Sequence, residues 1–297
     1  MLSKTLLATL VAREPSEVAP ALEALKPEDW PSLVQLSRLH RCTPLLRAQL
    51  RRLGWLSRLP EPVQQYLQQV TQLSASDNLR RFHELSQLMQ QLGEATRLIV
   101  LKGGRLARTH YEDISLRMMV DIDVLARPDD LPRVEAALQA IGFEQHQHQP
   151  DDEYEDCQHL PPFAKGRSSI ELHRTLLHGD SPYVIDEDAL WARSTAAATP
   201  GLRYLSREDQ LLHLCVHAGQ HHAFATGLYA LIDIARLSSD PALDWPLFTR
   251  IVRDSQADRC VYLMLRLAQE DAAAQIPAAA LAALCPAGYT SAHLAAV

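Results

Sequence analysis

Two aspartates one residue apart lie inside an apolar run, "MMVDIDVLA", which is the strongest chemical signal in the chain. The apolar residues of this run alternate with the acidic ones, as in a half-buried strand. Side chains at positions i and i+2 of a strand lie on one face, about 6.5 to 7 Å apart. Asp121 and Asp123 should therefore lie together, while Val120, Ile122 and Val124 face a hydrophobic core.

Carboxylates so placed repel each other, raise each other's pKa, and are stabilised by a divalent cation that accepts oxygen ligands. We therefore expect Asp121 and Asp123 to bind Mg²⁺, with Mn²⁺ as the alternative. A third carboxylate, Glu171, lies in "SSIELH", a second alternating run, and should also point away from the core. His173, in the same run, is a candidate for substrate contact.

Two adjacent glycines, Gly103 and Gly104, follow the apolar run "RLIVLK" and precede a short helix expected from about residue 105 to 111. A strand that ends in glycine lets the backbone approach a ligand and directs free N–H groups at it, which suits phosphate. Lys102 and Arg117 add positive charge nearby. Acidic groups, a glycine turn and basic residues are the parts needed for metal-assisted phosphoryl or nucleotidyl transfer.

The elements that must position these residues follow from hydrophobic periodicity. Apolar residues recur at helical spacing before residue 95 and again after residue 205, whereas short alternating runs between them are typical of strands. One further helix is expected within 128–142, followed by the acidic segment "DDEYED". We expect an α+β fold: a helical N-terminal region (1–95), a small mixed-sheet α/β core (96–180) and a helical C-terminal region (181–297).

Composition limits the partners of the protein. The chain has 297 residues and a formal net charge of −7, which argues against bulk binding of nucleic acid or of an anionic membrane. Six arginines between residues 38 and 58 are interpreted as a solvated helix face rather than an anion-binding surface. Five widely spaced cysteines without a C-x-x-C pair fit a reducing cytoplasm. No apolar run approaches the roughly 20 residues needed to cross a bilayer.

A second histidine-rich region follows later in the chain. His213, His217 and His221 recur every four residues, with His222 beside them, so they would share one helical face at a spacing compatible with a metal. No acidic partner with a zinc-site spacing accompanies them, and we favour a structural role. His217 is kept as a candidate for substrate contact, and Asp233 as a candidate to orient one of the histidines.

The segments "LKGG", "LRMMVDIDVLARPDDL" and "IELH" together resemble the polymerase-beta-type nucleotidyltransferase superfamily. Its pattern is a Gly-Gly or Gly-Ser turn, then acidic-x-acidic on one strand, then a third acidic residue on a later strand. Within it, the chain is most similar to a bacterial family of uncharacterised nucleotidyltransferases, over roughly residues 30 to 240. The resemblance implies Asp121 and Asp123 as metal ligands, Glu171 as the third carboxylate, and Gly103 and Gly104 at the nucleotide phosphates.

We accordingly expect an enzyme that uses Mg²⁺ to move a nucleoside monophosphate from a nucleoside triphosphate to an acceptor, with release of pyrophosphate. The acidic overall charge favours a small-molecule or peptide acceptor. Two alternatives stay open. The core could bind nucleotide without catalysis as a regulatory module, or the protein could be a toxin-like enzyme that modifies tRNA or a protein, with the arginine-rich stretch binding that acceptor.

Overall fold

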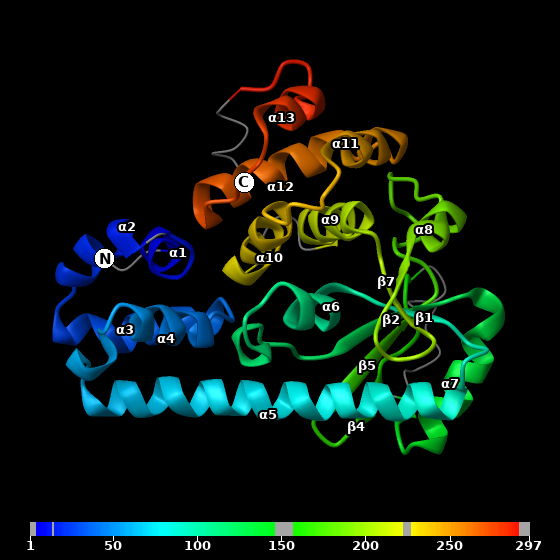
Figure 1. Ribbon diagram of the computed structural model, residues 1–297, viewed down its shortest axis with the longest axis horizontal. Coiled ribbons are helices and arrows are strands. Elements are labelled where there is room, and N and C mark those ends of the chain that lie inside the picture. Colours follow the sequence, from blue (N-terminus) through cyan, green and yellow to red (C-terminus); the bar gives the residue numbers. More distant parts are fainter. Residues whose placement is uncertain (1–3, 14, 146–156, 222–226, 291–297) are drawn as a thin grey trace.

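The computed structural model describes residues 4–13, 15–145, 157–221 and 227–290. The acidic segment expected after residue 150 and His222 lie outside these ranges. Helices precede and follow a central sheet, as Figure 1 shows. The expected mixed α+β architecture is therefore confirmed.

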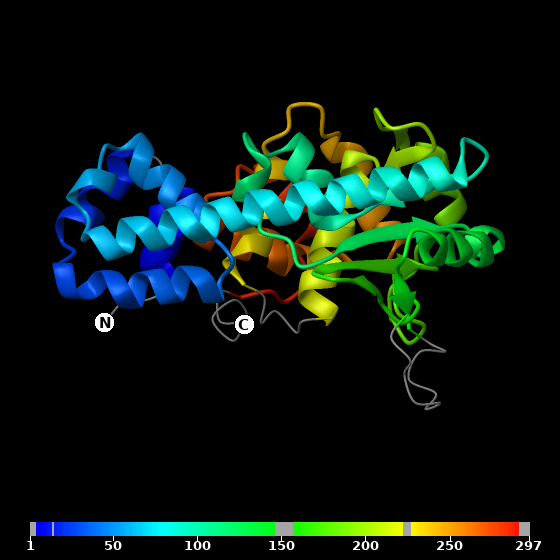
Figure 2. The same cartoon turned by 90° about the horizontal axis from the view of Figure 1, so that it is seen from below.

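The N-terminal helices lead into one long helix, α5, which runs from beneath them to the sheet (Figures 1 and 2). With 32 residues, α5 is about 48 Å long. The elements up to this point are α1 (Lys4–Ala12), α2 (Pro15–Glu23), α3 (Trp30–Leu39), α4 (Thr43–Arg52) and α5 (Glu61–Leu92), with 3₁₀ turns at Pro27–Asp29 and Leu56–Arg58.

The central region alternates short strands with short helices. Its elements are β1 (Leu98–Val100), α6 (Lys102–Thr109), the 3₁₀ turn η3 (Ile114–Leu116), β2 (Ile122–Ala126), a 3₁₀ turn (Pro128–Asp130), α7 (Leu131–Ala140), β3 (Glu144–Gln145), β4 (Phe163–Lys165), β5 (Ser168–His173), α8 (Glu187–Arg193), β6 (Thr195–Ala196) and β7 (Leu202–Tyr204). The C-terminal elements are α9 (Arg207–Val216), a π-helical turn (His217–His221), α10 (Leu228–Ser238), α11 (Trp245–Asp254), α12 (Asp258–Ala272) and α13 (Ala278–Leu284).

The strands form one mixed sheet in the order β3-β4-β5-β2-β1-β7-β6. The pairs β2/β5 and β1/β7 are parallel, and the remaining pairs are antiparallel. Two of its strands, β6 and β7, come after residue 180, where the α/β core was expected to end. The division of the chain into three regions stays a prediction.

One face of the sheet packs against α5 and α7 in a single hydrophobic cluster that includes Ile122 and Val124. The opposite face carries a smaller cluster, in which Leu125 packs with Trp191 of α8. The alternation expected around the aspartates thus holds for Ile122 and Val124. The expectation for Val120 is wrong: its side chain is 51% exposed, because β2 begins only at Ile122.

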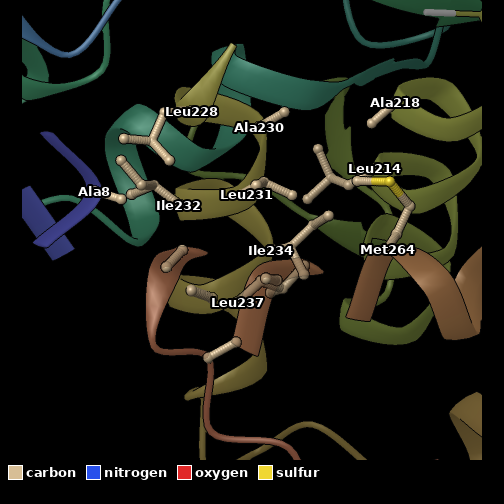
Figure 3. Packing of buried hydrophobic residues seen from close by; sticks show 14 of the residues in the cluster. Ala8, Leu214, Ala218, Leu228, Ala230, Leu231, Ile232, Ile234, Leu237 and Met264 are labelled. Atoms are coloured by element: carbon tan, nitrogen blue, oxygen red, sulfur yellow. The ribbon is translucent and has the colours of Figure 1, made fainter. Parts of the chain in front are cut away.

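The N-terminal and C-terminal helices share one hydrophobic core. Figure 3 shows Ala8 of α1 beside α10, and Leu214 of α9 close to Met264 of α12. This shared core fixes α9 and α10 next to the sheet, where they contribute side chains to the site described below. Among the described residues, no helix combines the length and the apolar character needed to span a membrane.

Candidate active site

The carboxylates of Asp123 and Glu171 lie side by side because their strands are neighbours. β2 and β5 pair in parallel, with Asp123 directly opposite Glu171, and His173 lies two residues further along β5 on the same face. One ligand atom from each of these three residues lies within 4.8 Å of the others. Carboxylate oxygens are the ligands that Mg²⁺ and Mn²⁺ prefer, and imidazole suits other transition metals such as Zn²⁺ or Fe²⁺. The donor set fits a divalent ion.

Asp121 lies just before β2 and lines the same cavity as Asp123 and Glu171. Burial, together with the negative charges of Asp123 and Glu171, raises the pKa of Asp121 to about 6. The nearby cations of Lys102 and Arg41 offset only part of this effect. Such an excess of negative charge is what a bound divalent cation would relieve.

Two side chains, of Lys102 and His173, hold Asp123 in place. Lys102 Nζ lies 2.7 Å from Asp123 Oδ1, and His173 Nε2 lies 3.0 Å from the same oxygen. Burial alone would raise the pKa of Asp123, but Lys102 and His173 hold it well below its usual range. A divalent ion bound to Asp123 would therefore compete with the Lys102 ammonium group.

His173 itself is fully buried, and its Nε2 is 3.7 Å from Glu171 Oε2. Its Nε2 thus contacts the carboxylates of both Asp123 and Glu171, and a contact of His173 with a substrate stays a prediction.

Two basic residues at the cavity have an uncommon backbone conformation. Lys102 has φ +43° and Arg41, between α3 and α4, has φ +53°. Among the described residues only four non-glycine positions have positive φ, and these two line the same cavity. Backbone of this kind is energetically unfavourable in non-glycine residues and clusters at functional sites.

The two glycines have different surroundings. Helix α6 begins at Lys102, about three residues earlier than expected, so both glycines lie in its first turn. A Cβ on Gly103 would lie 3.2 Å from Met119 Cγ, beside the cavity, whereas a Cβ on Gly104 would lie only 2.7 Å from Val100 Cγ2. Gly104 is thus required for packing of α6 on β1. Contact of either glycine with phosphate stays a prediction.

Arg117 lines the cavity but is already paired. Its Nη2 lies 2.8 Å from Asp233 Oδ2, both side chains are buried, and Tyr111 donates a hydrogen bond of 2.6 Å to Asp233 Oδ1. The Arg117 guanidinium also lies 4.6 Å from the centre of the Tyr229 ring. The hypothesis that Asp233 orients a histidine is wrong, because its partners are Arg117 and Tyr111.

Of the four histidines singled out in the sequence, His217 lines the cavity. It begins the π-helical turn after α9, and its ring lies 5.9 Å from that of the buried His213, edge to face. Helical turns of the π type are rare and often occur at functional sites. The side chains of His221 and His222 lie outside the described part of the chain. A role of His217 in substrate contact stays a prediction.

The cavity has a volume of about 360 Å³, within the range of small-molecule sites. Its walls come from β2, β5, α6, the π-helical turn and α10. A family model described as "Uncharacterised nucleotidyltransferase" matches residues 26–271, a segment that includes every wall of the cavity. The chain belongs to this uncharacterised nucleotidyltransferase family. No curated protein and no solved structure matches it.

Four residues that line the cavity of this family member were not recognised from the sequence as part of a site: Arg41, Gln158, His159 and Tyr229. Tyr229 and Asp233 are four residues apart in "YALIDIARL", so they face the same side of α10. A buried aspartate among the apolar residues of this helix was the signal that could have placed α10 at the site.

Proposed function

We propose that this protein uses Mg²⁺ to transfer a nucleoside monophosphate from a nucleoside triphosphate to an acceptor. The observation that supports this most strongly is the convergence of Asp121, Asp123 and Glu171 on one cavity, from β2 and the residue just before it and from the neighbouring strand β5. A cluster of three carboxylates is unfavourable without a compensating cation, and Lys102 supplies only one positive charge in contact with it.

In the reaction, the acceptor oxygen attacks the α-phosphorus, the bond from phosphorus to the bridging oxygen breaks, and pyrophosphate leaves. Asp121, Asp123 and Glu171 would hold Mg²⁺, or Mn²⁺ in its place, which neutralises charge developing on the phosphoryl oxygens. Glu171, whose side chain is 23% exposed, accepts the proton of the acceptor. The neighbouring Asp123 is 6% exposed and is held by Lys102, so it is less available for that role.

The remaining cavity residues would bind the triphosphate. Lys102, which contacts Asp123 at the edge of the cavity, would donate to a phosphate oxygen of the bound triphosphate. Gly103, at the start of α6, borders the cavity, and Arg41 adds a cation there. Arg117 acts mainly by fixing Asp233 and Tyr229, since its guanidinium is engaged with both.

The volume of the cavity and the acidic overall charge favour a small-molecule or peptide acceptor over nucleic acid. We place the reaction in the cytoplasm, where nucleoside triphosphates are present and where cysteines stay reduced. All five cysteines of the chain are free.

The test compares Asp121→Asn and Asp123→Asn with Asp188→Asn, a carboxylate that is 89% exposed on α8. Thermal stability is measured with ATP, GTP, CTP and UTP, each with Mg²⁺, Mn²⁺ or EDTA. A ligand at about 100 times its dissociation constant stabilises the fold by about 2.7 kcal/mol. We expect a metal-dependent shift with at least one nucleotide, lost in the two site variants and kept in the control.

Turnover is measured as pyrophosphate released when that nucleotide and an extract of metabolites and peptides are added. Turnover retained in both site variants would remove the metal proposal. Metal-dependent binding without turnover in the native chain would favour a nucleotide-binding regulatory module instead.

A further inference from the structure

A second cavity, of about 900 Å³, lies along helix α4 and is here called the α4 groove. Its walls come from α1, α4, α5, α10 and the segment 112–116. Five arginines line it: Arg13, Arg47, Arg51, Arg52 and Arg236. The groove contains none of the carboxylates of the candidate active site, and its charge is opposite to the net charge of the chain.

The two acidic residues of the groove are already engaged. Glu112 Oε2 lies 3.1 Å from Arg236 Nη1, and Asp113 accepts a hydrogen bond of 2.8 Å from the backbone N–H of Ser115. By contrast, within the described part of the chain, the side chains of three groove arginines on α4 make no hydrogen bond or ion pair: Arg47, Arg51 and Arg52. No carboxylate of the described residues contacts them directly, although the nearby charges of Asp113 and Glu112 offset part of the positive charge of Arg51 and Arg52.

This arrangement is unfavourable for the isolated protein. Arg47 and Arg51 lie four residues apart on α4, and like charges at this spacing destabilise a helix by about 0.2 to 0.5 kcal/mol. Arg52, beside Arg51, adds a third positive charge. A planar guanidinium presents parallel N–H donors that match phosphate and carboxylate groups, so a multiply charged anion in the groove would relieve the repulsion.

The uncharged lining narrows the class of ligand. Leu45, Ala48 and Leu116 contribute apolar surface between the arginines. Among the described residues that line the groove, none is aromatic, so the stacking platforms typical of single-stranded nucleic acid sites are missing. A compact ligand with several anionic groups and some apolar surface fits this lining best.

Side-chain contacts connect the α4 groove to the active-site cavity. The Arg236 guanidinium lies 4.3 Å from the centre of the Tyr111 ring, and the Tyr111 hydroxyl binds Asp233, which lines the active-site cavity. Asp233 also holds Arg117, so a chain of one cation–π contact and several hydrogen bonds runs from the groove to the active-site cavity.

We propose that the α4 groove is a second binding site, which takes a small ligand with at least two phosphate or carboxylate groups. This inference does not depend on nucleotidyl transfer, because none of the metal-site carboxylates lines the groove. Phosphate and carboxylate ligands share the required chemistry, and the experiment separates them.

The experiment is calorimetric titration in EDTA at low salt with two probes, inorganic triphosphate and citrate. The groove variant is Arg47→Gln/Arg51→Gln. Its matched control is Arg38→Gln/Arg58→Gln, which removes the same charge from the same region outside the groove. A hydrogen bond to a charged group contributes about tenfold or more to affinity, so we expect the groove variant to weaken binding of one probe at least about tenfold. The control should bind within about twofold of the native chain.

The probe that binds identifies the ligand as a phosphate or a carboxylate. The proposal is overturned if neither probe binds, or if the groove and control variants weaken binding equally. It is also overturned if Arg41→Gln, at the active-site cavity, abolishes binding while the groove variant does not. Asp121→Asn/Asp123→Asn should bind the probe normally in EDTA, so a failure of the proposed catalysis and a failure of this second site are distinguishable.

Discussion

The active-site cavity and the α4 groove both contain cationic side chains, but only those of the cavity are paired with buried carboxylates. In the cavity, Lys102 contacts Asp123, and Arg117 contacts Asp233. In the groove, Arg47 and Arg51 have no contacting partner within the described residues. Paired, buried charges fix geometry before any ligand arrives, whereas unpaired, accessible charges are available to a ligand. Replacing a charge of the first kind should lower the free energy of unfolding strongly, and replacing one of the second kind should change it little.

The largest effect is expected at the Arg117–Asp233 pair. Both side chains are almost fully buried, and removal of one leaves the other as an uncompensated charge. We expect Arg117→Met or Asp233→Leu to lower the free energy of unfolding by about 3 to 5 kcal/mol, measured by urea denaturation. The double variant Arg117→Met/Asp233→Leu should recover much of this loss, because it leaves no isolated buried charge.

The matched control is the exposed pair of Arg127 and Asp188, whose side chains are 41% and 89% exposed. Arg127→Gln should change the free energy of unfolding by less than about 1 kcal/mol. If the Arg117 variant lowers the free energy of unfolding no more than this control does, the Arg117–Asp233 pair does not fix the geometry of the cavity. The proposed difference between the cavity and the groove would then be wrong.

An intermediate effect is expected at the start of α6, where the two glycines differ. Gly104→Ala would place a Cβ 2.7 Å from Val100 Cγ2 and should destabilise the fold by about 1 to 3 kcal/mol. A Cβ on Gly103 would lie 3.2 Å from Met119 Cγ and 3.3 Å from Arg117 Cζ, contacts that a shift of a few tenths of an ångström relieves, so Gly103→Ala should destabilise the fold less. It should weaken the nucleotide-dependent thermal shift instead, since Gly103 borders the cavity.

Thermal unfolding of both variants, with and without Mg²⁺ and the best nucleotide, checks this difference. Equal loss of stability in the two variants, with the nucleotide shift unchanged, would show that both glycines serve packing alone.

Local pattern was sufficient to predict the α+β architecture and the strand that contains Asp123, because alternation within one run of residues reports which face is buried. It also gave the correct face for Glu171. Their direct juxtaposition could not be read from the sequence, since it depends on parallel pairing between β2 and β5, which lie about 50 residues apart. β6 and β7 were missed because two or three residues show no periodicity.

The sequence also could not show the roles of residues whose partners lie far away in the chain. Arg117 was expected to add positive charge near the phosphates, and its pairing with Asp233, 116 residues away, could not be read from the sequence. The arginines of α4 were interpreted as a solvated face, and their side chains do lack partners among the described residues. The concave surface around them comes from α1, α5 and α10, which no local pattern in α4 could indicate.

The smallest effect is expected in the α4 groove. Arg47→Gln/Arg51→Gln removes a repulsive pair four residues apart, so the free energy of unfolding should rise, or stay within about 0.5 kcal/mol of the native value. Urea denaturation at low salt and at 1 M NaCl tests the cause. The Debye length falls to about 3 Å at 1 M salt, and any gain from relieved repulsion should disappear there. A loss above about 1 kcal/mol that persists in salt would instead make these arginines structural, like Arg117. The charges of the groove would then stabilise the fold, as those of the cavity do, and only the shape of the groove would support a ligand in it.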